Sequence, residues 1–297
     1  MRSLVCLALV LGLCGGVLAK QVKPAPLGAE EIVARNVEAR GGLEGWRNID
    51  TMIWAGRLES DTAPTPSMAF TLQQARPNKT RFEVSGIGFR AMRIFDGARG
   101  YKVRARHEGG PDVQPFSMDE VRFAREAQGI EGPLIDYAAK GSSVSLVGKE
   151  KIEGHEAYHL SVHFSSGEHQ EVWVDTTSFL DVRADRPSYQ SSASATVPIY
   201  YRDFKNFNGL MIPTVMDIGV GTGRTPDRMI IERVLLNPHI DAQTFERPGA
   251  PRRQGPETMR ARFNTPPPMR RVPQLPPAPQ PPAVGVPASE PTAPSQP

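Results

Sequence analysis

The chain has 297 residues, a formal net charge of +3, 29 prolines and only two cysteines. Residues 248–297 hold 16 of the prolines and a net charge of +4, so the rest of the chain, without Arg2, carries −2. The basic balance is therefore a property of this tail and predicts no nucleic-acid binding by the remainder. Cys6 and Cys14 both fall within the first nineteen residues, which excludes disulfides and thiolate metal sites from the rest of the chain.

The N-terminal segment has the parts of a secretory signal peptide. A positive charge precedes an apolar run over residues 4–17, and Val17-Leu18-Ala19 forms a small-residue cleavage site before Lys20. The run is shorter than a membrane-spanning helix requires. We therefore expect residues 1–19 to be removed and the rest of the chain to be exported to the periplasm.

An alternative for the same segment is a lipid anchor on Cys14. A lipoprotein signal places a small residue directly before the modified cysteine, and here that place holds Leu13. We therefore do not expect lipidation at Cys14.

The tail over residues 248–297 contains runs such as Pro266-Pro267-Pro268. A segment of this composition cannot build a packed core, so we predict a disordered or extended polyproline chain. Residues 20–247 are long enough for one large domain with a substantial core.

Local patterns in residues 20–247 predict a helix, then many strands. The helix covers residues 29–40, with Ile32, Val33 and Val37 on one face, and Gly41-Gly42 ends it. A short helix or turn follows over residues 43–49. Apolar alternation between turn residues predicts strands over 51–60, 67–75, 79–85, 89–96, 101–106, 143–147, two within 154–175, then 179–185, 196–206, 210–220 and 228–236.

Two further helices interrupt the strands. Ser117 and Glu120 form a capping box for a helix over residues 117–128, and Pro133 opens a second one through about Ala139. Many short antiparallel strands in sequence predict a meander, which forms either a barrel or a strongly curved open sheet. The two helices would pack across its mouth, over an interior cavity.

The segment over residues 154–175 predicts a hairpin. Apolar and polar residues alternate along its first strand, with Tyr158, Leu160 and Val162 on one face. If Ser166-Gly167 are the central turn residues, Leu160 lies opposite Trp173.

The same segment contains His155, Glu156 and His159 in the H-E-x-x-H pattern of zinc proteases. The pattern binds zinc on a helix, where residues four apart lie one turn apart. On a strand the two histidines lie about 13 Å apart and cannot share one ion. The chain also contains no glycine-rich phosphate loop and no G-x-S-x-G serine. We therefore expect no metal, no cofactor and no enzymatic activity, with a zinc hydrolase as the alternative that this pattern leaves.

Four short pieces of sequence resemble the periplasmic outer-membrane lipoprotein-sorting proteins with the LolA-like fold. They are Glu38-Ala39-Arg40-Gly41-Gly42 before the strand with Gly56; Tyr158-His159-Leu160 before Val172-Trp173-Val174-Asp175; Tyr201-Arg202-Asp203-Phe204 before Gly209-Leu210-Met211-Ile212-Pro213; and Val234-Leu235-Leu236-Asn237 before Ile240-Asp241 and Phe245. The resemblance implies a mainly β (α+β) fold, in which a half-barrel of about eleven antiparallel strands stays open and lid helices cover an apolar cavity. It also implies a monomeric carrier that binds the acyl chains of lipids or lipoproteins and contacts membranes and envelope proteins transiently.

Large apolar side chains along the predicted elements are candidates for the cavity lining, although each of them also suits ordinary core packing. They are Trp54, Phe70, Phe82, Phe89, Met92, Leu134, Ile135, Tyr137, Leu160, Val162 and Trp173. The alternative to a carrier is a module of the same fold that senses the state of the envelope or docks on a protein partner without transporting lipid.

Overall fold

The computed structural model describes residues 26–63, 65–104, 110–126, 129–187, 196–219, 223 and 225–249. The predicted signal peptide, Cys14 and all but the first two residues of the predicted tail lie outside these ranges. The chain divides into two compact units, residues 1–250 and 251–297. All described residues belong to the first unit.

A single antiparallel sheet of thirteen strands forms the body of this unit. Its spatial order is β6-β5-β4-β3-β2-β1-β13-β12-β11-β10-β9-β8-β7, and the sheet is open at β6 and β7. The strands are β1 (Thr51–Glu59), β2 (Ser67–Ala75), β3 (Lys79–Gly86), β4 (Phe89–Phe95), β5 (Gly100–Arg104), β6 (Asp112–Pro115), β7 (Ser143–Ile152), β8 (His155–His163), β9 (His169–Asp175), β10 (Asp181–Pro187), β11 (Thr196–Phe207), β12 (Leu210–Ile218) and β13 (Asp227–Leu236).

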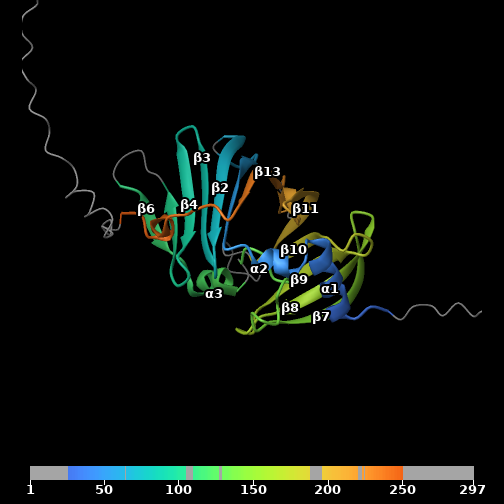
Figure 1. Cartoon of the computed structure of the whole chain (residues 1–297). Coiled ribbons are helices and arrows are strands. Elements are labelled where there is room, and N and C mark those ends of the chain that lie inside the picture. The colour runs from blue at the N-terminus through green and yellow to red at the C-terminus, as the bar shows by residue number, and fades with distance from the viewer. Residues whose placement is uncertain are drawn as a thin grey trace, which may run out of the picture. The chain divides into compact units, whose positions relative to one another are not determined.

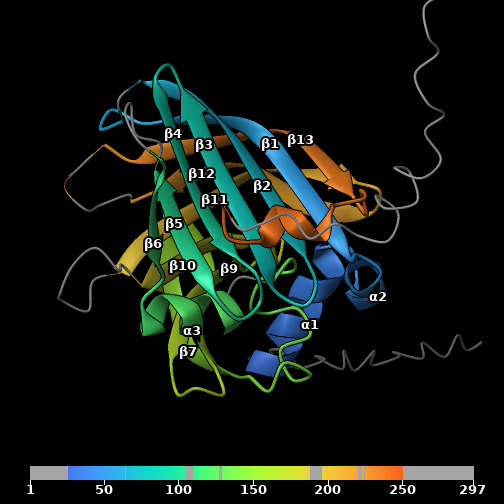
Figure 2. The same cartoon turned by 90° about the vertical axis from the view of Figure 1, so that its left-hand side faces the viewer.

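The described residues also form three α-helices and one 3-10 helix (Figure 1). They are α1 (Ala29–Ala39), α2 (Leu43–Arg47), α3 (Met118–Glu126) and η1 (Ala242–Phe245). In Figure 2 the sheet curves so that β1 to β4 lie in front of β11 and β12, and α1, α2 and α3 lie at its lower end. This arrangement confirms the fold class that the sequence resemblance implied, an open and curved antiparallel sheet with a few helices.

Helix α1 packs on the β8–β10 part of the sheet through its apolar face. Ile32 and Val33 are buried against the apolar side chains of β8 and β9. The helix ends where Gly41 has a φ of +111° and approaches the turn between β11 and β12. A side chain at Gly41 would place its Cβ 2.3 Å from the carbonyl oxygen of Gly209. Glycine is therefore required for this contact between the helix end and the turn.

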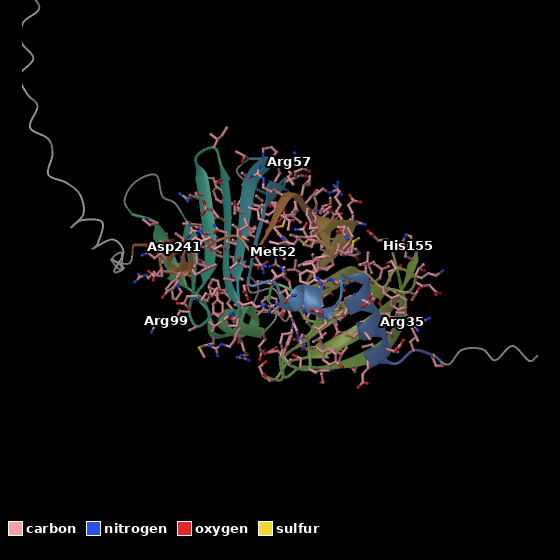
Figure 3. All side chains as sticks on the ribbon, in the orientation of Figure 1. Arg35, Met52, Arg57, Arg99, His155 and Asp241 are labelled. Atoms are coloured by element: carbon pink, nitrogen blue, oxygen red, sulfur yellow. The ribbon has the colours of Figure 1, made fainter. Side chains whose placement is uncertain are left out.

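The curved sheet has two arms, one that runs from β1 to β6 and one that runs from β13 to β7. Apolar side chains of both arms form the core. Met52 of β1 is fully buried among Trp46, Ile49 and Ile212, and Figure 3 shows it in the interior, while Arg57 of the same strand points outward. The alternation of the strand thus separates an inner face from an outer face.

The 3-10 helix η1, one strand and one helix differ from the prediction, and η1 was not predicted. Strand β6 was not predicted, because it is a four-residue edge strand without apolar alternation. The predicted helix over residues 133–139 was wrong, since this stretch forms turns in which Asp136 has a φ of +56°. The carboxylate of Asp136 instead pairs with Arg47 of α2, with Oδ1 2.7 Å from Nη2.

The register of the central hairpin also differs from the prediction by one residue. Leu160 pairs with Val172, and His159 pairs with Trp173. The loop contains one residue more than predicted, because the amide of Gly167 donates to the carbonyl of Phe164 and Gly167 has a φ of +90°. This is the three-residue hairpin loop, which ends in a left-handed glycine.

Candidate functional site: a cavity between the sheet and the helices

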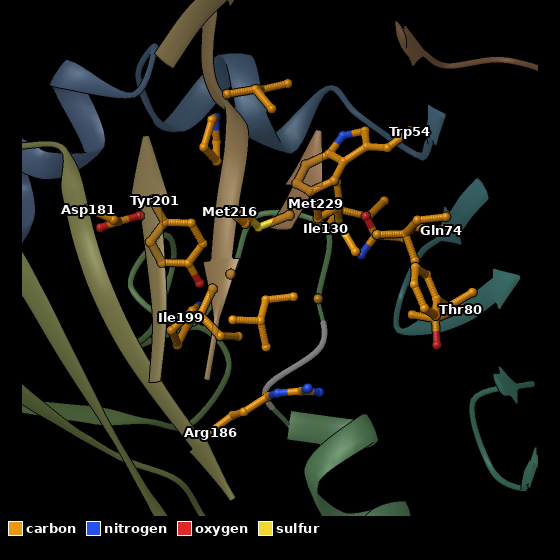
Figure 4. Close-up of a pocket in the computed structure, with 18 of the residues that line it drawn as sticks. Trp54, Gln74, Thr80, Ile130, Asp181, Arg186, Ile199, Tyr201, Met216 and Met229 are labelled. Atoms are coloured by element: carbon orange, nitrogen blue, oxygen red, sulfur yellow. The ribbon is translucent and has the colours of Figure 1, made fainter. Parts of the chain in front are cut away.

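The inner face of the sheet and the helices enclose a cavity of about 420 Å³ (Figure 4). Two arms of the sheet supply its walls, and both arms present mainly apolar side chains there. The apolar lining consists of Trp46, Trp54, Leu58, Leu72, Phe82, Phe116, Phe123, Ile130, Pro133, Ile199, Ile212, Pro213, Met216, Ile218 and Met229.

Residues 129–133 cover part of the cavity, and a group of charges around Glu131 holds this stretch in place. The side chain of Glu131 is 6% exposed, with Oε2 3.1 Å from Nη1 of Arg76 and Oε1 3.3 Å from Nζ of Lys140. Its backbone carbonyl accepts a hydrogen bond of 3.0 Å from Arg40 at the end of α1. Burial lowers the pKa of Lys140, and the Glu131 carboxylate opposes that change. The polar contacts of one residue thus fix the cover to Arg40 and Arg76, which directly follow α1 and β2.

The first turn of α3 is attached to the sheet through the predicted capping box. The Ser117 hydroxyl accepts from the amide of Glu120, and the Glu120 carboxylate accepts from the amide of Ser117. The same carboxylate binds Arg93 at 2.9 Å and Lys102 at 3.0 Å. Burial of this carboxyl raises its pKa, but the hydrogen bonds from Ser117, Arg93 and Lys102 outweigh it, so the pKa of Glu120 lies below its ordinary value. One residue both caps the helix and fixes it to β4 and β5.

Polar side chains line the cavity from both parts of the sheet. One group comes from the end of α1 and from β9, β10 and β11, and consists of Arg40, Gln170, Asp181, Arg186 and Tyr201; the other comes from β2, β3, β4 and β13, and consists of Gln74, Thr80, Arg93 and Asp227. Asp181 accepts from Asn36 of α1 and lies 3.1 Å from Nη1 of Arg40. Burial of the hydroxyl, followed by the nearby carboxylate of Asp181, raises the pKa of Tyr201 to about 12. Tyr201 therefore stays neutral and can donate a hydrogen bond into the cavity.

The predicted lining residues fall into several groups in the structure. Trp54 and Phe82 line the cavity. Seven others belong to apolar clusters elsewhere in the core. The cluster under α1 contains Leu134, Tyr137, Leu160 and Val162. The cluster beside α2 contains Ile135, and a third cluster on β2 to β4 contains Phe70 and Phe89. Whether any of these residues binds lipid remains a prediction.

Two of the predicted residues belong to the outer face. The sulfur of Met92 accepts from Arg81, whose guanidinium also donates to the carbonyl of Thr244 in η1. Trp173 alternates with Val172 and Val174, which pack under α1, so it points to the opposite face.

Trp173 belongs to a row of paired residues that crosses the outer face from β8 to β13. The row consists of His159, Trp173, Arg183, Tyr200, Asp217 and Arg228. The rings of His159 and Trp173 stack at 4.3 Å, and the Arg183 guanidinium lies 4.3 Å from the Trp173 ring centre. At the other end, Asp217 is 3% exposed and binds Arg202 and Arg228 at 2.7 Å each. These contacts join six strands on the side away from the cavity.

The H-E-x-x-H residues lie on β8, as the alternation predicted. His159 lies between Glu150 and Glu171, with nitrogen–oxygen distances of 2.8 and 2.7 Å. His155 is exposed at the start of β8 (Figure 3). In the described part of the chain, no group of three or more histidine, cysteine, aspartate or glutamate side chains is placed to hold a metal ion.

Sequence reasoning missed the polar residues of the cavity. The available signal was Gln170, a polar residue that occupies the inner face of β9 in line with Val172 and Val174. Arg40 and Tyr201 lay within the motifs that carried the resemblance, but nothing in those motifs pointed to a cavity.

An open curved sheet with a mostly apolar cavity on its inner face can enclose an apolar or amphipathic small molecule. None of the helices that the structure describes has the length and apolar content needed to span a bilayer.

No protein-family model and no curated protein matches the chain. Among solved structures, the chain is similar to a LolA superfamily protein from Nitrosomonas europaea, at 13% sequence identity, covering 75% of this chain and 99% of that one with a TM-score of 0.48. It is also similar to a DUF1329 family protein from Desulfovibrio piger, at 13% identity, covering 73% of this chain and 97% of that one with a TM-score of 0.41.

Proposed function

We propose that this chain is a non-enzymatic periplasmic carrier that binds the acyl chains of lipoproteins or other lipids in the cavity. The observation that carries the proposal is the cavity itself, which has a volume of about 420 Å³ and a lining in which apolar side chains predominate. Removing an acyl chain from water contributes about 0.8 kcal/mol for each methylene. An apolar cavity of this kind supplies that free energy without any chemical step.

The polar residues of the lining favour binding over catalysis. Among the described residues that line the cavity there is no histidine, serine, cysteine or lysine. The common pairs of a serine or cysteine nucleophile with a histidine base are therefore not formed by these residues.

Native mass spectrometry of the full exported chain, purified from bacterial periplasm without detergent, tests the proposal. We expect a monomer that carries adducts of lipid mass, and we expect organic extraction to remove them. The variant Met216→Trp, which fills the cavity with a larger apolar side chain, should carry fewer adducts than the wild type. The variant Leu146→Trp on the exposed edge strand β7 serves as the matched control.

The same spectrum separates the alternatives. A clean mass without adducts from the wild type would contradict the carrier and favour a docking or sensing module of the same fold. A zinc adduct that chelation removes would favour the hydrolase.

A further inference from the structure

Polar groups line both walls of the cavity, and one of these walls contains the buried Oε1 of Gln170, which has no hydrogen-bond partner among the described residues. Figure 4 shows Asp181, Tyr201 and Arg186 toward one side of the view and Trp54, Gln74 and Thr80 on the other. The first three come from the neighbouring strands β10 and β11, and Gln170 comes from the adjacent strand β9. We call the wall that contains Gln170, Arg186 and Tyr201 the polar wall.

The groups of the polar wall lie close enough to influence one another. Three charges act on the Tyr201 hydroxyl. The carboxylate of Asp181 raises its pKa, and the guanidinium groups of Arg40 and Arg186 lower it. Asp181 is already engaged, because it accepts from Asn36 and pairs with Arg40. The negative charge of Asp181 is therefore balanced by Arg40.

Two buried side chains of the cavity lining have atoms without a hydrogen-bond partner among the described residues. Gln170 is 7% exposed, and its Oε1 accepts no hydrogen bond. Arg40 is also 7% exposed, and its Nε–H donates none. Leaving a buried polar group unsatisfied is unfavourable, so such groups are usually explained by a missing partner.

Donors dominate the polar wall. The Tyr201 hydroxyl and the amide nitrogen of Gln170 can donate, and so can the Nε–H of Arg40 beside this wall, whereas Arg186 contributes a positive charge. The acceptor on this wall besides Asp181 is Oε1 of Gln170. A group with anionic oxygens matches this set best, because hydrogen bonds to a charged acceptor are the strong ones.

The volume limits the length of the chain that accompanies such a group. A volume of about 420 Å³ lies near the lower end of the range of about 300–1,000 Å³ that is usual for pockets of small ligands. This size favours a single-chain amphiphile over a lipid with several chains.

We propose that the polar wall is a head-group subsite, and that the cavity takes a single-chain amphiphile with a carboxylate or phosphate head. The head lies against Gln170, Arg186 and Tyr201, and the chain lies against the apolar side chains of β1, β2, β12 and β13. This inference rests on the proposed function, since it names the class of lipid that the cavity accepts.

Calorimetric titration of the delipidated full chain at neutral pH tests the subsite with four probes. They are dodecanoate, dodecyl phosphate, methyl dodecanoate, which keeps the chain but not the charge, and inorganic phosphate, which keeps the charge but not the chain. We expect dodecanoate and dodecyl phosphate to bind at least about tenfold more tightly than the methyl ester, the effect of one charge-assisted hydrogen bond. Inorganic phosphate is not expected to bind.

Variants assign the difference to the polar wall. Tyr201→Phe and Arg186→Gln should each reduce the preference for dodecanoate over its methyl ester by about three- to tenfold, while binding of the ester stays unchanged. The matched control is Thr80→Val, which removes one hydroxyl from the opposite wall and should leave the preference unchanged.

The outcomes separate this inference from the proposed function. Equal binding of the acids and the ester, or a preference that both polar-wall variants retain, overturns the subsite while the carrier function stands. Inorganic phosphate binding as tightly as dodecyl phosphate also overturns it, because the wall would then be a site for free anions. Binding of none of the three chain-bearing probes overturns both.

Discussion

Replacing Glu131 by glutamine should loosen the cover of the cavity. Glutamine preserves the shape of the side chain and removes the charge that pairs with Arg76 and Lys140. Removing one partner of a buried ion pair costs about 3–5 kcal/mol. The lower end of this range applies, because Arg76 and Lys140 are 30% and 28% exposed and are partly solvated. Both cations also keep hydrogen bonds to backbone carbonyls, including 2.7 Å from Lys140 Nζ to Gly132.

The expected loss of about 3 kcal/mol corresponds to a decrease in Tm of roughly 6–12 °C for a domain of this size. Thermal unfolding followed by circular dichroism measures the global effect. Hydrogen exchange of residues 129–142 measures the local one, and we expect faster exchange there than in the strands. The pKa of Lys140, which burial already lowers, should fall further without the carboxylate that opposes the change.

The control is Glu156→Gln, which removes the same charge from an exposed position of β8. It should change Tm by less than about 2 °C. If Glu131→Gln behaves like this control and exchange over residues 129–142 is unchanged, the charges around Glu131 contribute no net stability, and the contacts that we assign to the cover do not hold it.

Three further substitutions test other parts of the structure. The pKa of Asp217 lies below its ordinary value, because hydrogen bonds from two arginines outweigh the effect of burial, which raises it. The stability that Asp217 contributes is therefore present above about pH 4 and is lost as the pH falls through its lower folded pKa. The free energy of unfolding of Asp217→Asn, measured with urea, should therefore depend less on pH in that range than that of the wild type. Gly56→Ala should destabilise the junction of β1 and β13 by at least about 1–3 kcal/mol, since the new Cβ would lie 1.9 Å from the carbonyl oxygen of Ile230. Leu160→Ala should cost about 2–5 kcal/mol in urea unfolding, because Leu160 is fully buried under α1.

Each of these expectations has a contradicting result. Parallel pH profiles for the wild type and Asp217→Asn would mean that the carboxylate gains nothing from its arginines. A wild-type Tm for Gly56→Ala would mean that β1 and β13 separate there at little cost. A loss for Leu160→Ala no larger than that for Leu146→Ala on the exposed edge strand would remove Leu160 from the core.

The sequence predicted the strands well because each carries its own information. Alternation and turn residues act within a few positions, so the hairpin at Asn208-Gly209 and the strand with Leu160 could be located without tertiary contacts. The capping box of Ser117 and Glu120 was equally local, and both of its hydrogen bonds are present.

The errors arose where distant contacts decide the conformation. Residues 133–139 have helical composition, but Asp136 adopts a left-handed conformation and pairs with Arg47, which is 89 positions away in the chain. The hairpin register depended on a single loop residue, which alternation along either strand could not reveal.

The candidate site was the least predictable feature. Alternation showed that Trp173 and Val172 lie on different faces, but it could not show which face the sheet curves around. The cavity depends on that curvature and on the positions of the helices, which contacts between distant residues decide. Residue type alone therefore could not distinguish Trp54 and Phe82, which line the cavity, from Trp173, which lies on the outer face.

The order of the strands also places the cover of the cavity on the connection between the two edges of the sheet. The chain builds β1 to β6 outward to one edge of the sheet, and then crosses to β7 at the opposite edge before returning to β13 beside β1. The crossing segment contains α3 and the stretch around Glu131, so the part of the chain that joins the two edges is also the part that closes the cavity. The two edge strands β6 and β7 are therefore consecutive in the chain although they lie at opposite ends of the sheet, and the segment that connects them lies against the cavity.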